Sequence, residues 1–163
     1  MNKLDIGKIN DHAPYDVFYD GDAIIFHTDH DVDYSVTFDD DGNPYFTAYW
    51  FNLSNMNGGT SPGDKKIAQT VICIIEEFFR ENPEILLYLC STDDNQQAQR
   101  ARLFLRWFNG AQQQSLYAIR TAELNSENGK EYVALIVQRS NPHVEEILQF
   151  FENDVAMFNE MKP

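Results

Sequence analysis

The sequence predicts one α+β domain in which three helices pack on a mixed, mostly antiparallel sheet. Short β-rich runs separated by turn residues fill the first third of the chain, as in a strand meander. Apolar residues then recur at helical spacing in three later segments, interleaved with further strand-like runs. A length of 163 residues suits a single domain, 1–163, and an apolar content of 43% is enough to build its core.

Residues 15–53 are expected to form an antiparallel meander. Two β-rich runs, YDVFYDG and DAIIFHT, meet at the Asp-Gly-Asp turn of residues 20–22, which is a hairpin signal. The next run, at 34–38, alternates apolar and polar residues, so its apolar side chains should share one face. DDDGN then turns the chain into an aromatic strand at 45–53.

The middle of the chain predicts a helix followed by a buried strand. Residues 64–81 carry apolar side chains on one helix face, and Asn82 and Pro83 end that helix. This apolar stripe consists of Ile67, Val71, Ile74, Ile75 and Phe78. ILLYLC, at 85–90, is a near-continuous apolar run typical of a central strand that is buried on both faces.

The stretch CSTDDNQQAQRARLFLRWF, at 90–108, predicts a second helix over 94–109. Its apolar stripe consists of Ala101, Phe104, Leu105 and Phe108. Asp93 or Asp94 lies where an N-cap belongs, because its carboxylate can accept from free backbone N–H groups. Gly110 lies where a helix often ends.

The same stretch contains the candidate ligand-binding residues. Half of the six arginines of the chain lie in it, and arginine suits phosphate or carboxylate ligands. Pairing with the abundant acids of the protein suits these arginines equally, and Arg100, on the border of the stripe, could reach an acid in a neighbouring element. The candidate site consists of Arg100, Arg102, Arg106, Asp93, Asp94 and Asn95.

A long hairpin and a last helix are expected at the C-terminal end. SLYAIRTAEL and KEYVALIVQR are strand-like runs joined by NSENG. The helix is predicted over 142–159, with Asn141 as its cap and Pro142 at its first position. Its buried face should consist of Val144, Ile147, Leu148, Phe151, Val155 and Phe158.

The formal charge of −14 disfavours binding to nucleic acids, whose phosphates it would repel, and leaves basic proteins or cations as partners. No stretch approaches the ~20 apolar residues needed to span a bilayer, and no apolar run of signal-peptide length opens the chain. We therefore expect a cytoplasmic protein that does not enter membranes. Its two cysteines, Cys73 and Cys90, should be reduced and buried.

One cluster of metal-ligand types occurs in HTDHDVD, at 27–33. Histidine and aspartate suit a divalent ion, but strand alternation points successive side chains apart, so we expect no metal site. Cys90 ends a strand just before a helix start, which could lower a thiol pKa. Because no histidine lies near it in the sequence, we interpret it as structural.

The element order over 45–139 resembles the C-terminal half of the GNAT acetyltransferase fold. That resemblance implies acyl-CoA bound between the strands at 45–53 and 85–91, which should be parallel neighbours. The family pattern of an Asn, an Ala and an aromatic residue after the later strand is similar to Asn95, Ala98 and Phe104 here. The loop GGTSPGDKKIA departs from the family, because Pro62 lacks an N–H and Asp64 places negative charge where a pyrophosphate should rest.

KIAQTVICIIEEFF followed by CSTDDNQQAQRARLFLRWF is also similar to small bacterial domains of unknown function. This resemblance implies no activity. We expect a non-enzymatic protein without a cofactor that acts through protein contacts, with a second copy of the chain as one candidate partner. The alternative is an acyl-CoA-dependent N-acyltransferase.

Overall fold

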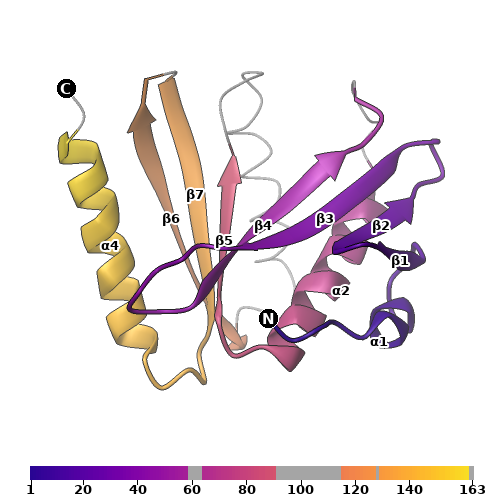
Figure 1. The fold of residues 1–163 in the computed structure, drawn as a ribbon, viewed down its shortest axis with the longest axis horizontal. Coiled ribbons are helices and arrows are strands. Elements are labelled where there is room, and N and C mark those ends of the chain that lie inside the picture. Colours follow the sequence, from indigo (N-terminus) through magenta and orange to yellow (C-terminus); the bar gives the residue numbers. More distant parts are fainter. Residues whose placement is uncertain (59–63, 91–114, 128, 162–163) are drawn as a thin grey trace. The chain divides into compact units, whose positions relative to one another are not determined.

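A computed structural model describes residues 1–58, 64–90, 115–127 and 129–161. These residues contain three helices and seven strands, and the strands form one mixed sheet in the order β1-β2-β3-β4-β5-β7-β6 (Figure 1). The predicted α+β class is confirmed. The chain divides into two compact units. Unit 1 comprises Met1–Asp39 and Phe51–Pro83, and unit 2 comprises Asp40–Trp50 and Glu84–Pro163.

Unit 1 begins with the predicted antiparallel strands. β1 (Val17–Asp20) pairs with β2 (Ala23–His27), and β2 pairs with β3 (Asp33–Asp40), all antiparallel. Gly21, in the turn between β1 and β2, has a φ of 61°, a backbone conformation that glycine adopts without steric cost. The Asp-Gly-Asp hairpin is therefore confirmed.

β4 (Ala48–Asn55) begins three residues later than the predicted start at 45. The reason is the side chain of Asn43. Its Oδ1 accepts hydrogen bonds from the backbone N–H groups of Tyr45, at 2.8 Å, and Phe46, at 3.2 Å. These bonds hold the backbone in a turn, so the aromatic run cannot join the sheet until Ala48.

α2 (Lys65–Glu81) follows the prediction closely. The side chain of Asp64 accepts from the N–H of Lys66 at the helix start, and Asn82 caps its end. All five residues of the predicted stripe are buried, and Phe79 is buried beside them. A short helix that the sequence did not predict, α1 (Ile6–Asn10), precedes β1. It is one turn long and buries only Ile9, so it leaves no apolar periodicity to detect.

Unit 2 contains β5 (Ile85–Cys90) and the predicted hairpin of β6 (Tyr117–Ser126) and β7 (Gly129–Gln138). β7 pairs antiparallel with both β5 and β6. The N–H of Ile85 donates to the carbonyl of Thr47 at 3.2 Å, which brings the start of β5 to the start of β4. These two sheet neighbours therefore run parallel, as expected.

β5 is buried over only half of its length. Ile85, Leu86 and Leu87 are buried, whereas Leu89 is 40% exposed, so the expectation of a strand buried throughout was wrong for its second half. β5 is nevertheless central in the strand order, between β4 and β7. The apolar run therefore predicted a central strand correctly, but it did not predict how many of the strand's residues are buried.

The last helix, α4 (Val144–Met161), begins two residues after the predicted start at 142. The side chain of Asn141 accepts from the N–H of His143 at 2.9 Å, and the Asn141 carbonyl accepts from the N–H of Val144 at 3.1 Å. Pro142 therefore lies in the turn that precedes the helix. The core of unit 2 consists of Ala48, Ile85, Leu87, Ala118, Leu135, Val137, Ile147 and Leu148.

A candidate binding pocket in unit 2

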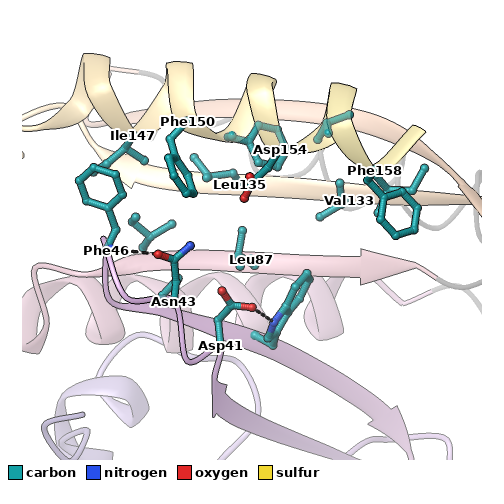
Figure 2. Close-up of a pocket in the computed structure, with 16 residues that line it drawn as sticks. Asp41, Asn43, Phe46, Leu87, Val133, Leu135, Ile147, Phe150, Asp154 and Phe158 are labelled. Carbon is teal, nitrogen blue, oxygen red and sulfur yellow. Dashed lines mark hydrogen bonds between the residues drawn. The ribbon is translucent and has the colours of Figure 1, made fainter. Parts of the chain in front are cut away.

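A cavity of about 390 Å³ lies in unit 2, between α4, the strands β5, β6 and β7, and the segment 41–50 (Figure 2). Thirteen of its sixteen lining residues are apolar. The other three are Asp41, Asn43 and Asp154. This volume and composition are those of a binding site for an apolar group, with a few polar side chains to orient it.

The floor of the pocket comes from alternate residues of neighbouring strands. Leu87 of β5 pairs directly with Leu135 of β7, so both side chains project from the same face of the sheet. Val133, two residues from Leu135, lies on the same face. Leu124 of β6 completes the floor. These aliphatic side chains are short, and the cavity is the space that they leave beneath α4.

The roof of the pocket is the apolar face of α4. Phe151, Asp154, Val155 and Phe158 recur at helical spacing and line the cavity. Of the predicted buried face, Ile147 and Leu148 are buried, whereas Val144, Phe151 and Val155 are half-buried and Phe158 is 38% exposed. The expectation that this whole face is buried was therefore wrong, because its second half borders open space.

α4 is fastened on both sides of that open space. At its start, Ile147 and Leu148 pack in the core of unit 2. Near its end, Asn159 accepts from the N–H of Asn125 at 2.9 Å and donates to the carbonyl of Glu123 at 3.0 Å. Both partners belong to β6, the last strand of the sheet order. Because α4 is held at its start and near its end, it cannot move toward the sheet and close the cavity.

Aromatic rings form one end of the pocket. The ring of Phe46 lies 5.7 Å from that of Phe150 in an edge-on arrangement, and the ring of Tyr45 lies 5.4 Å from that of Phe150. His143 also contacts Phe46, with 6.5 Å between the ring centroids. The Asn43 turn, which delays β4, is what places these two aromatic residues against α4.

Two carboxylates supply the charge of the pocket. The Oδ1 atom of Asp41 accepts from the indole N–H of Trp50 at 2.7 Å, which fixes the carboxylate at the wall. Asp154 projects from α4 toward the floor (Figure 2). No hydrogen bond or ion pair to Asp154 occurs among the described residues. Both aspartates are exposed, so the pocket carries negative charge at the edge of its apolar surface.

The sequence predicted six candidate ligand-binding residues. They lie outside the described residues, as does the predicted helix over 94–109, so the ligand-binding role proposed for them stays a prediction. These residues are Arg100, Arg102, Arg106, Asp93, Asp94 and Asn95. The pocket residues were missed because most of them looked like core. One signal was available: Asp154 falls on the apolar stripe of α4, three residues after Phe151 and four before Phe158.

Ion pairs connect the side chains of the HTDHDVD segment, at 27–33 in unit 1, to one another and to α2. His27 contacts Asp33 through Nδ1 and lies 3.7 Å from Asp31 through Nε2. The hydrogen bond to Asp33 raises the pKa of His27. Asp29 instead pairs with Lys66 of α2 at 2.9 Å, and this bond lowers the pKa of Asp29. The cluster thus ties the turn after β2 to itself and to the start of α2.

The start of α2 does not offer a free anion site. The Asp64 carboxylate caps the helix, and its side chain is only 9% exposed. It also accepts from the Tyr15 hydroxyl, and burial followed by this bond raises the pKa of Tyr15. A buried carboxylate at this position opposes a pyrophosphate, as the sequence suggested. Cys73, also in α2, is a half-buried free thiol whose pKa is raised by burial, which disfavours a nucleophilic role.

Among the described helices, none is long and apolar enough to cross a membrane. No curated protein and no solved structure matches the chain. A family model matches residues 63–153, which include all of α2, all of β5 to β7 and the first half of α4. The chain belongs to DUF6169, a family of unknown function.

Proposed function

We propose that this is a non-enzymatic binding protein that acts through protein contacts, and that the unit 2 pocket is its contact site. The observation that supports this most directly is the pocket itself, a half-open cavity beneath the apolar face of a helix. Leaving such a face uncovered costs hydrophobic free energy, so an open apolar cavity beside solvent marks a place where something binds.

The surroundings of the pocket favour a protein partner over a small molecule. Tyr45, which contacts the lining residue Phe150, is 73% exposed, and Phe158 at the lining is 38% exposed. Exposed aromatic side chains therefore continue the apolar surface beyond the cavity. Aromatic residues are enriched in protein interfaces, where they fill pockets and exclude water.

The chemistry of the lining supports binding more than catalysis. Its described residues include no cysteine, serine, threonine, histidine, lysine or tyrosine. Asp41 is held by Trp50, and no described base or nucleophile stands beside Asp154. Catalysis of acyl transfer requires a positioned base and donors for a developing oxyanion, which this lining does not bring together.

Peptide selection tests the proposal. A displayed library of random 12-residue peptides is selected against the wild-type protein, and single clones are scored on two variants. Val155→Trp places an indole in the cavity, so recovered peptides should lose binding. Met157→Trp adds the same side chain on α4 at a residue that is 59% exposed and does not line the pocket, so binding should persist.

The proposal is wrong if no peptide is recovered, or if the recovered peptides bind both tryptophan variants as well as wild type. Should Val155→Trp unfold the protein, Phe158→Ala serves in its place. That change removes a half-exposed ring from the lining and should weaken the same peptides without preventing folding. Circular dichroism melts of each variant establish that folding is intact.

A further inference from the structure

We infer that the segment bound in this pocket carries a lysine or arginine next to its apolar side chains, and that Asp154 and Asp41 receive its charge. This inference rests on the proposed function and specifies the chemistry of the partner. It follows from the charges on the lining, from the lack of a partner for Asp154 among the described residues, and from the placement of the described basic residues of unit 2.

The charged groups of the described lining all have the same sign. Asp41 and Asp154 are its ionisable residues, and Asn43 is its other polar side chain. Both aspartates are exposed, so their carboxylates lie in solvent at the edge of the apolar surface, where they repel an anion and attract a cation.

The described residues of unit 2 do not supply the cation to the pocket. Of the three described Lys and Arg residues of unit 2, none lines the pocket. Lys130 pairs with Glu123 at 3.3 Å, near the β6–β7 turn. Arg120 projects from the floor side of β6, opposite Leu135, but its guanidinium is exposed and donates to the carbonyl of Ile119 at 2.9 Å. The third, Arg139, follows the end of β7.

Asp154 is positioned to meet a ligand. It lies on the helix face that lines the cavity, with Val155 beside it, and its carboxylate points into the open space (Figure 2). It has no hydrogen-bond or ion-pair partner within the described part of the chain. The Asp41 carboxylate engages Trp50 through one oxygen and can accept further bonds. A bare metal ion would leave the thirteen apolar lining residues without a role.

A basic side chain fits both the apolar walls and the negative charge of the pocket. The aliphatic stems of lysine and arginine can cover apolar walls while the charged end reaches a carboxylate. The net charge of −14 also attracts a basic partner over longer distances and speeds its association. A partner segment of mixed apolar and basic residues therefore matches the pocket better than a purely apolar or an acidic one.

The test uses the peptides recovered on the wild-type protein. We expect lysine and arginine to be enriched over aspartate and glutamate relative to the unselected library. Asp154→Asn should weaken the binding of a basic peptide roughly two- to fivefold, the range for an exposed charge contact. Glu152→Gln removes the same charge from an exposed residue of α4 outside the pocket and should change binding by less than about twofold.

A double-mutant cycle isolates the contact. Replacing the basic residue of the peptide by glutamine should abolish the effect of Asp154→Asn. Peptides that bind through the pocket without a basic preference, or that bind Asp154→Asn as well as wild type, would overturn the inference and leave the proposed function standing. A failure to recover any peptide would remove both.

A second measurement separates a basic protein from a free amine. N-phenyl-1-naphthylamine, a neutral dye, reports on the apolar cavity, and octylamine, octanol and octanoate compete for it. Octylammonium should displace the dye best, and Asp154→Asn should remove its advantage over octanol. Octylammonium binding without any peptide binding would assign the site to a small amine and overturn the protein partner.

Discussion

Among the described residues, two long amphipathic helices differ in how completely their apolar faces are buried. In unit 1, α2 buries its whole apolar stripe, and Phe78 is 0% exposed. In unit 2, α4 buries the first part of its stripe and leaves the remainder at the border of a cavity. Both helices have a clear apolar face in the sequence. The contrast shows that an apolar stripe in the sequence identifies a helix that packs on the sheet. It does not show how much of that stripe is buried in the folded protein.

Side-chain size on the opposing strands explains the contrast. Phe38 of β3 stacks on Phe78 with 5.1 Å between ring centroids, and Phe51 packs edge-on against Phe38 at 5.7 Å. Large rings from the strands therefore fill the space under α2. α4 instead faces short aliphatic side chains, such as Ala118, Val133 and Leu135, which leave room. The space beneath the helix is therefore filled in unit 1, whereas a cavity remains there in unit 2.

The largest effect is expected in the closed region. Phe78→Ala should lower the free energy of unfolding by about 3–5 kcal/mol, the range for a fully buried aromatic residue in a packed core. Denaturant unfolding followed by circular dichroism measures the change. A loss below about 1 kcal/mol would mean that the space around Phe78 is already loose, and the contrast between the two helices would fail.

The anchor of α4 should have an intermediate effect. Asn159→Ala removes two hydrogen bonds to the backbone of β6 and should cost about 1–2 kcal/mol. Hydrogen exchange at the N–H of Asn125 should also become faster. Asn153→Ala removes an exposed asparagine that accepts from Gln149 of the same helix, so it is the matched control and should change the free energy of unfolding little.

Phe158→Ala should cost under about 1 kcal/mol, because much of this ring already faces water or the cavity. Its effect on peptide binding should exceed its effect on unfolding, which is the reverse of the pattern at Phe78. Parallel denaturant and binding titrations compare the two. A cost similar to that of Phe78→Ala would show that the second half of α4 belongs to the closed core.

The smallest effect concerns His27 in unit 1. Its pKa is raised by the hydrogen bond to Asp33, so protonation favours the folded state. This contribution is fully present below the unfolded pKa of about 6.5 and is lost as pH rises through the higher folded pKa. Thermal melts of wild type and His27→Gln should therefore differ most near pH 5.5 and converge at alkaline pH. A difference that grows with pH would contradict the assignment.

Local chemistry made much of the fold predictable. The Asp-Gly-Asp turn, the Asn82-Pro83 stop and the spacing of apolar residues correctly indicated the first hairpin, α2 and the β6–β7 hairpin. These signals act over a few residues, through backbone conformation and helical period. The starts of β4 and α4 were displaced by two or three residues, because the side chains of Asn43 and Asn141 bond the backbone that follows them.

Apart from α1, the sequence by itself thus determined the type of each described helix and strand, and the parallel neighbours β4 and β5. Only the tertiary structure decided that a cavity remains between α4 and the sheet. It also decided that Asn159 bonds the end of α4 to β6, and that Asp41 and Asp154 line the same cavity. Asp41 and Asp154 are more than a hundred positions apart in the chain. The physical reason is that the periodicity of apolar residues predicts which face of a helix or strand is buried. The volume left between two such faces depends on side chains that meet only after folding.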